Sequence, residues 1–270
     1  MTHHLPSQVP PGALSARRFR AVRTVLALVL REVATSFGQS PGGYLWAVIK
    51  PVAVITVLTL VFAKAFRAPA LGTNFPLFYA SGFLPFSLYG DMGNKISKAL
   101  VFSRQLLFYP GVRYIDAILA RFLLTLLTQL AIFLLGMGLI HLFYRLNPIL
   151  DVPAIALSLA MAAALGLGIG TLNCYLKSAF PIWEHFFAIL TAPLFILSTI
   201  IFTFESVPRD WRGVLWYNPL VHVVGMMRRG FYPSYDAPYV SPLYVFGVAL
   251  VTLALGLVLL QRFHRDILNM

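Results

Sequence analysis

Uncharged apolar runs, each long enough to cross a lipid bilayer, account for much of this sequence. Five of them are Ala68 to Gly90, Phe122 to Tyr144, Val152 to Leu176, His185 to Phe204 and Ala237 to Gln261. A helix needs about 20 apolar residues to cross the hydrocarbon core. A further stretch, Leu45 to Phe66, has Lys50 and Lys64 near its ends, where long side chains can reach the headgroups. The sequence therefore predicts an all-α integral membrane protein with six transmembrane helices.

The charge distribution agrees with this class and gives an orientation. Charged residues make up only 11% of the 270 residues, too few to cover a soluble protein of this size. The net charge of +12 does not indicate nucleic acid, because the basic residues flank the spans and form no single soluble patch. With both termini cytoplasmic, fourteen Lys and Arg residues lie inside and seven outside, which favours this orientation. Cys174 stands alone in a predicted span, so no disulfide is expected.

The region before the first span is expected to hold a disordered cytoplasmic tail, residues 1–13, and an amphipathic helix, residues 14–40. Apolar residues recur at three- and four-residue spacing from Phe19 to Phe37, and arginines project from the other side. This pattern is typical of a helix lying in the inner membrane interface, with a soluble packing helix as the alternative. The tail has no apolar core, so no cleavable signal peptide is expected. Residues 41–270 would form the membrane domain.

A polar interruption from Asp91 to Arg121 separates two apolar regions. It carries five basic residues against two acidic ones, so it should stay on the cytoplasmic side. Within it, residues 94–108 are expected to form one amphipathic helix. Such a helix between two spans is either a docking device or an ordinary loop lying on the headgroups.

A second unusual stretch, Gly213 to Met227, is uncharged but only 15 residues long, too short to cross the bilayer. Asn218 and Pro219 divide it, since Asn favours the N-cap and Pro the first turn of a helix. The expected structure, over residues 209–232, is a re-entrant helical hairpin on the outer side that bounds an aqueous path. Two amphipathic helices resting on the outer headgroups are the alternative.

No cluster of side chains suited to catalysis or metal binding is predicted within the spans. All nine acidic residues fall in loops, at loop edges or on the interface helix, so no proton relay at the bilayer midplane is indicated. Glu184 and His185 are a poor metal pair because adjacent helical residues do not share a face. The phosphate-binding pattern G-x-x-x-x-G-K-[ST] does not occur, so any ATP must be bound by another subunit.

Three motifs, in order between the expected spans, resemble those of a known family. They are Arg31 with Phe37-Gly38-x-Ser40-x-x-Gly43-Tyr44-Leu45-Trp46-Ala47 and Pro51, then Arg113-x-x-Asp116-x-x-Leu119-Ala120-Arg121, then Trp216-Tyr217-Asn218-Pro219-Leu220-x-His222 with Arg228 and Gly230. With these motifs the chain resembles the ABC-2 type polysaccharide export permeases, in particular the capsule-export (KpsM-like) membrane subunits. Gly42 departs from the pattern, since the family more often has leucine before the glycine.

The resemblance implies a homodimer in the bacterial inner membrane, with a channel at its interface and two ATPase subunits that bind ATP and Mg²⁺ below. The chain itself would hold no cofactor. The implied function is export of lipid-linked capsular polysaccharide to the periplasm, with a periplasmic polysaccharide co-polymerase and an outer-membrane export protein as further partners. Helix 94–108 would be the coupling helix, and hairpin 209–232 the periplasmic gate.

The resemblance also suggests residues for each role. Contacts with the ATPase are assigned to Asn94, Lys95, Lys98, Phe102, Arg104 and Leu107. Contacts with an anionic lipid headgroup are assigned to Arg17, Arg20, Arg23 and Arg31. Channel contacts, where sugars stack on aromatic faces, are assigned to Tyr44, Trp46, Trp183 and Phe187, with membrane anchoring as the alternative. The gate is assigned to Trp211, Trp216, Asn218, Pro219, His222 and Arg228.

Other functions stay open at this point. The same architecture could export O-antigen or teichoic acid. A membrane enzyme acting on lipid-linked sugars would depend on His222 or Glu205. A secondary transporter would need a charged or broken site near the midplane together with internal repeats.

Overall fold

The structure, a computed structural model, describes residues 23–31, 43–107, 113–144 and 149–269. Of Gly43 to Leu45, of Leu106 and Leu107, and of residues 264–269, only the backbone is described. All regular structure in the described residues is helical. Besides the helical residues 23–31, the elements are α2 (Gly43–Ala65), α3 (Phe75–Ser97), α4 (Ala99–Leu107), α5 (Tyr114–Tyr144), α6 (Val152–Ala179), α7 (Ile182–Thr191), α8 (Leu194–Leu197), η1 (Phe204–Ser206), α9 (Arg209–Trp216), α10 (Pro219–Phe231) and α11 (Pro242–Asn269).

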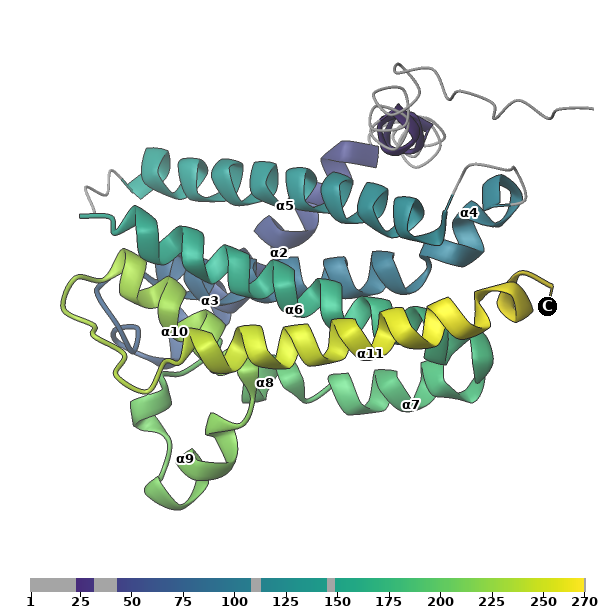
Figure 1. Ribbon diagram of the computed structural model, residues 1–270. Coiled ribbons are helices and arrows are strands. Elements are labelled where there is room, and N and C mark those ends of the chain that lie inside the picture. Colours follow the sequence, from purple (N-terminus) through teal and green to yellow (C-terminus); the bar gives the residue numbers. More distant parts are fainter. Residues whose placement is uncertain (1–22, 32–42, 108–112, 145–148, 270) are drawn as a thin grey trace, which may run out of the picture.

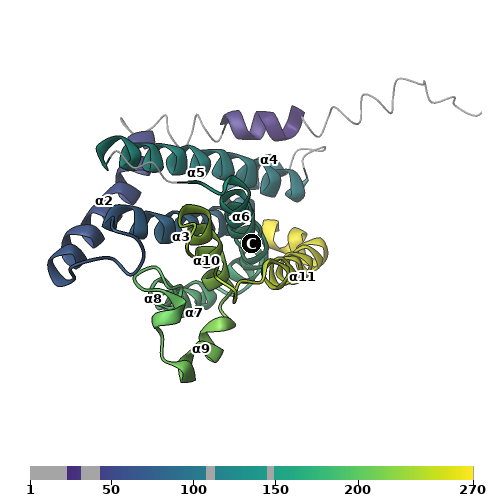
Figure 2. The same ribbon diagram turned by 90° about the vertical axis from the view of Figure 1, so that its left-hand side faces the viewer.

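The bundle has two distinct ends (Figure 1). One end carries α4 and the C-terminus, and we call it the α4 end. The opposite end carries α10, and we call it the α10 end. Viewed from the α10 end, α9 projects away from the bundle while α10 lies near its centre (Figure 2).

Four helices are long and apolar enough to cross a membrane. They are Trp46–Ala65 of α2, Tyr114–Tyr144, Val152–Ala179 and Pro242–Phe263 of α11. The apolar stretches of the sequence predicted these four helices, although α5 begins eight residues before the uncharged run Phe122 to Tyr144. The all-helical, multi-span class is confirmed.

Helix α6 forms the centre of the bundle and packs most extensively against α3 and α11. Glycines permit this contact. A Cβ atom on Gly168 would lie 2.4 Å from the Ala249 carbonyl oxygen, and one on Gly166 would lie 2.6 Å from Cβ of Met92. The glycines of α6 thus allow close approach of α11 on one side and of α3 on the other.

Helix α3 begins and ends later than the uncharged run Ala68 to Gly90, and the predicted helix 94–108 is wrong as a single helix. Helix α3 continues through Pro85 to Ser97, the chain turns at Lys98 (φ −101°, ψ 10°), and α4 starts at Ala99. The apolar residues around the turn, Ile96 and Leu100, are buried in the main core cluster. Burial of both side chains requires the change of direction, and no glycine or proline in the sequence marks it.

The fifth predicted span is wrong as a continuous helix. Helix α7 ends at Thr191, and Pro193 immediately precedes the four-residue α8, where its missing N–H favours a helix start over a continuing helix. After α8, Thr199 adopts a left-handed conformation (φ 58°), which ends the helical path. The chain nevertheless proceeds through α7, α8 and α9 from the α4 end towards the α10 end (Figure 1).

The contact between α6 and α11 can be tested with a single methyl group. We expect Gly168→Ala to force the two backbones apart and to lower the free energy of unfolding by about 1–3 kcal/mol. Gly138→Ala on α5 is the matched control, because its Cβ would meet no atom within 4 Å. Thermal unfolding in detergent measures both variants. Equal midpoints for the two would contradict the assigned packing.

Candidate functional site

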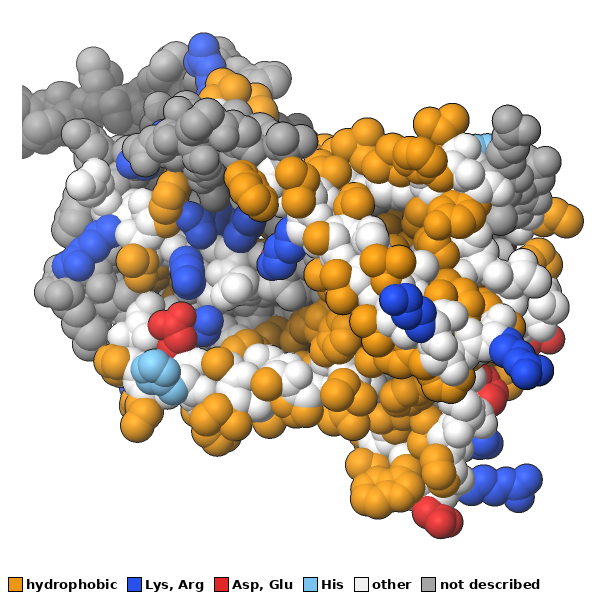
Figure 3. Space-filling view, turned by 180° about the vertical axis from the view of Figure 1, so that it is seen from behind, with side chains coloured by type: hydrophobic (Ala, Val, Ile, Leu, Met, Phe, Trp, Pro, Cys, Tyr) orange, Lys and Arg blue, Asp and Glu red, His pale blue; other side chains and the backbone are white. Residues whose placement is uncertain are grey.

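A cavity of about 690 Å³ lies between α3, α6 and the α7–α8 segment, and α2 contributes to its edge. Its lining combines aromatic side chains with charged and amide groups. The lining residues used below are Lys50, Asp91, Asn94, Lys98, Asn173, Lys177, Glu184, Phe187 and Phe195. Seen from behind, this face has a hollow with basic side chains gathered beside it, while apolar side chains cover most of the remaining face (Figure 3).

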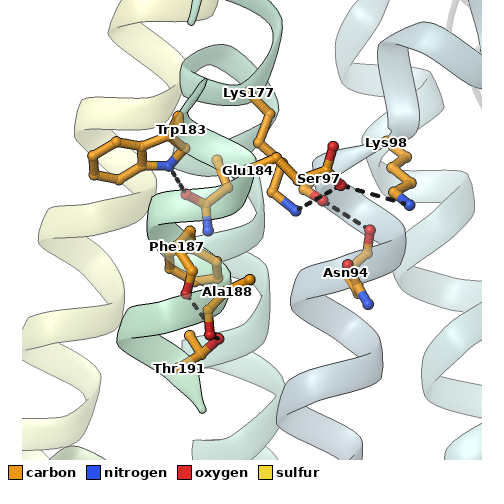
Figure 4. A network of polar contacts seen from close by, with 10 residues as sticks. Asn94, Ser97, Lys98, Lys177, Trp183, Glu184, Phe187, Ala188 and Thr191 are labelled. Carbon is orange, nitrogen blue, oxygen red and sulfur yellow. Dashed lines mark hydrogen bonds and ion pairs between the residues drawn. The ribbon is translucent and has the colours of Figure 1, made fainter. Parts of the chain in front are cut away.

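A carboxylate bridges three helices at the α4 end of this cavity (Figure 4). Oε1 of Glu184 on α7 lies 4.0 Å from Nζ of Lys98, which follows α3, and 3.9 Å from Nζ of Lys177 on α6. The Lys98 and Glu184 side chains are 60% and 58% exposed. The Lys177 side chain is 13% exposed. Because the Glu184 carboxylate itself is exposed and neither pair is closer than 3.9 Å, each pair contributes only about 0–1 kcal/mol, and together they hold α7 weakly.

The cavity carries a positive excess. Its lining has the three lysines Lys50, Lys98 and Lys177 against the two carboxylates of Asp91 and Glu184. Asp91 also accepts a hydrogen bond from the Gln129 side-chain amide. The two carboxylates therefore do not fully compensate the charge of the three lysines, so the cavity would attract an anionic group.

Of the aromatic residues assigned to the channel, Phe187 lines the cavity. Trp183 lies one turn earlier on α7 (Figure 4). Its indole N–H donates to Oδ1 of Asn173, 2.8 Å away, and Asn173 lines the cavity. Trp46 is 66% exposed and lies one helical turn before Lys50 on α2. The Tyr44 side chain lies outside the described residues.

Two helices, α9 and α10, occupy the stretch for which the hairpin was predicted. Oδ1 of Asn218 accepts a hydrogen bond from the Leu220 N–H at 3.0 Å, and Pro219 is the first residue of α10, as the Asn-Pro pair predicted. The two halves differ in environment. Helix α9 is largely exposed, and so is its Trp211 side chain. Nearly all of α10 is buried against α6 and α3.

Both ring nitrogens of His222 form hydrogen bonds that hold α10 against its neighbours. Nδ1 accepts from the Ser241 backbone N–H at 3.1 Å, so Nε2 carries the proton and donates to the Trp216 carbonyl oxygen at 2.8 Å. The Trp216 indole N–H donates to the Tyr239 carbonyl oxygen at 3.0 Å. Burial lowers the pKa of His222, and the hydrogen bond to Trp216 offsets part of that effect. Neutral His222 thus has a structural, hydrogen-bonding role.

Arg228 is a functional candidate whose contacts the sequence did not predict. Its side chain is fully buried, and its guanidinium donates to the carbonyl oxygens of Phe202 and Ile200 at 2.8 and 2.9 Å. Burial lowers its pKa to about 10, which still leaves the group charged at neutral pH. A pair of arginines, Arg228 and Arg229, in the last turn of the otherwise apolar helix α10 was the available signal. The sequence could not show which backbone carbonyl groups the Arg228 side chain contacts.

Comparison with known proteins identifies the class. Residues 23–232 match the family of ABC-2 type transporters. The chain belongs to this family.

Three relatives illustrate the range of similarity. The chain is 34% identical over 236 residues to the polysialic acid transport protein KpsM of Escherichia coli, covering 87% of this chain and 92% of that protein. It is 25% identical over 251 residues to the capsule polysaccharide export inner-membrane protein CtrC of Neisseria meningitidis serogroup A, covering 91% and 92% of the two chains. It is 23% identical over 246 residues to the capsule polysaccharide export inner-membrane protein BexB of Haemophilus influenzae, again covering 91% and 92%. The chain is thus a multi-pass inner-membrane permease subunit that works with a separate ATPase.

In this ABC-2 permease the residues assigned to ATPase coupling fall into separate environments. Asn94 and Lys98 line the cavity, at the end of α3 and just after it. The Lys95 carbonyl oxygen accepts from Nη1 of Arg121 at 2.6 Å, and the Phe102 ring of α4 lies 4.3 Å from the same guanidinium. Arg104 is exposed on α4, and the Leu107 side chain lies outside the described residues.

The residues assigned to a lipid headgroup are described only in part. Arg17 and Arg20 lie outside the described residues. Arg23 and Arg31 are at the two ends of the helical residues 23–31, with Arg23 exposed and Arg31 partly buried. Their role stays a prediction.

The neutral state of His222 gives a pH dependence. Because folding lowers the pKa of His222, the native state binds this proton less readily than the unfolded chain does. The stabilisation is therefore present above the unfolded pKa of about 6.5 and is lost as the pH falls below it. We therefore expect a lower unfolding midpoint in detergent at pH 5 than at pH 7.

The variant His222→Gln should abolish most of this pH dependence, while His185→Gln, which changes an exposed histidine on α7, should retain it. The same slope in both variants would show that another group is responsible.

Proposed function

We propose that this permease is the membrane subunit of an ATP-driven exporter that moves lipid-linked capsular polysaccharide from the cytoplasm to the periplasm. Its similarity over nearly its whole length to three proteins named for polysialic acid transport or capsule polysaccharide export carries this proposal. The polar and aromatic cavity along the bundle is consistent with it.

The proposed topology has six crossings, with the α4 end in the cytoplasm. The four long spans supply four crossings, α3 supplies the second, and α7, α8 and the following segment supply an interrupted fifth. Supporting this orientation, Lys95, Lys98, Arg113 and Lys177 all belong to the α4 end. Both termini would then be cytoplasmic, and the α9–α10 hairpin would re-enter from the periplasmic face.

The cavity is proposed to be part of the export path, completed by a second copy of the chain. Sugar rings stack on aromatic faces, and Phe187 and Phe195 offer two such faces in the lining. The lysine excess would attract the acidic groups of a polymer or of its lipid linker. Weak attachment of α7 through Glu184 would let the wall move aside as the polymer enters.

The α4 helix is proposed to receive the motion of the ATPase. Arg121 on α5 joins the end of α3 to Phe102 of α4, so a push on α4 would reach both long helices. Two ATPase subunits would supply the ATP and Mg²⁺ sites. A co-polymerase in the periplasm and an outer-membrane export protein would receive the polymer.

Deletion of the gene in a capsule-forming bacterium tests the function. We expect loss of surface capsule, with polymer accumulating in the cytoplasm, and restoration by the wild-type gene. The double variant Lys50→Met/Lys177→Met should insert normally but lower export several-fold, since it removes two cations from the cavity. Normal capsule in the deletion strain would contradict the proposed function.

Charge reversal tests the coupling role separately. The triple variant Lys95→Glu/Lys98→Glu/Arg104→Glu should stop export without lowering membrane insertion, because it places negative charge where the ATPase docks. Lys98 also pairs with Glu184, so Glu184→Gln, which removes that ion pair without changing an assigned docking residue, is the control. Normal export by Glu184→Gln and none by the triple variant would support docking. Normal export by the triple variant would remove the coupling assignment.

A further inference from the structure

The interrupted fifth crossing leaves backbone carbonyl groups without helical partners. Past Leu197 the chain is no longer α-helical, and Thr199 takes a left-handed conformation unfavourable for a β-branched residue. Buried carbonyl oxygens need hydrogen-bond donors from elsewhere, most of all within a membrane. The donors to this segment therefore show what holds the interruption in place.

Side chains of the hairpin supply those donors. Asn218 Nδ2 donates to the Leu197 carbonyl oxygen at 3.1 Å, at the end of α8. Further along, Nη2 and Nη1 of Arg228 donate to the carbonyl oxygens of Ile200 and Phe202 at 2.9 and 2.8 Å. Three carbonyl groups over six residues are thus held by two residues at or within α10.

The surroundings of Arg228 fix its guanidinium. The group lies 4.2 Å from the centre of the Phe78 ring on α3, a stacking arrangement that a planar guanidinium can make while its edge donates hydrogen bonds. Close packing of the segment on α3 also depends on Gly82, because a Cβ there would lie 3.2 Å from the Ile200 Cα. The interruption is therefore clamped between α3 and α10.

We propose that Arg228 is a positioning residue that fastens α10 to the interrupted fifth crossing, so that the hairpin moves together with the wall of the cavity. Helices α7 and α8 contribute Phe187 and Phe195 to that wall, and the chain runs from α8 directly into the carbonyl groups that Arg228 holds. A displacement of the wall at the α4 end is thereby passed to the α10 end. This inference rests on the proposed export through the cavity.

The distance between the two elements tests the inference directly. Spin labels are attached at Ile189→Cys on α7 and Tyr217→Cys at the start of the hairpin, both exposed in the wild type. The full chain is assembled with its ATPase in membranes, diluted with unlabelled chains, and the distance distribution is recorded by double electron–electron resonance. The native Cys174 is buried, which keeps background labelling low.

We expect a narrow distribution with Arg228 and one at least about twice as broad in Arg228→Met, together with a severe loss of export. Arg228→Lys keeps the charge but not the two donors of the guanidinium. Its distance distribution and its export should be intermediate between those of the wild type and of Arg228→Met. The matched control is Arg229→Met, which removes the neighbouring exposed arginine and should match the wild type in both readouts.

A narrow distribution in Arg228→Met, or equal broadening in Arg229→Met, would overturn the inference. If Arg228→Met does not accumulate, the lysine variant decides, and wild-type width with wild-type export in that variant would also overturn it. Failure of the proposed function is distinguishable, because then the wild-type protein would export no capsular polysaccharide whatever the distances show.

Discussion

Satisfaction of buried carbonyl groups is the constraint on which this membrane structure depends. Two of its helices are interrupted, one after Ser97 and one after Leu197. At each interruption a buried arginine from another helix donates hydrogen bonds to backbone carbonyl oxygens and lies against a phenylalanine ring. Arg121 donates to the Lys95 carbonyl oxygen and lies against Phe102. Arg228 donates to the carbonyl oxygens of Ile200 and Phe202 and lies against Phe78. Without Arg228 the second interruption would leave the Ile200 and Phe202 carbonyl groups unpaired away from water, at a cost of several kcal/mol each in lipid. The two arginines also join separate elements: Arg121 of α5 joins α3 to α4, and Arg228 joins α10 to the segment after α8.

The bundle divides into a tightly packed part and a weakly attached part. Helices α3, α6 and α11 approach one another closely through glycines, and α10 is buried against α6. By contrast α7, all of whose residues are described, has no buried residue and contacts α6 only slightly. The cavity lies between these parts. Movement of α7 and α8 relative to α3, α6 and α11 would change the size of the cavity, which suits a path for a long polymer.

The sequence was sufficient where a single physical rule governs a segment. Long apolar stretches predicted the four long spans, and Asn218-Pro219 predicted the start of α10, because bilayer thickness and N-capping act locally. It was insufficient where tertiary contacts override local preference. The turn at Lys98 has no glycine or proline and depends on the burial of Ile96 and Leu100, while the left-handed Thr199 depends on contacts with α3 and α10. Similarly, Phe187 could be proposed as a channel residue from its type, but the convergence of Lys50, Lys98 and Lys177 on one cavity required the fold.

Site-specific photocrosslinking tests the central claim, that the polymer passes along the cavity walled by α7. A photoreactive phenylalanine analogue is placed at Phe187, which lines the cavity, or at Ile189, which is 74% exposed on α7 and is not among the lining residues. Export is stalled with a non-hydrolysable ATP analogue in cells that make radiolabelled polysaccharide. The account predicts crosslinked polymer from position 187 and none from position 189. Crosslinks of equal yield from both positions, or none from position 187 while position 189 reacts, would contradict it.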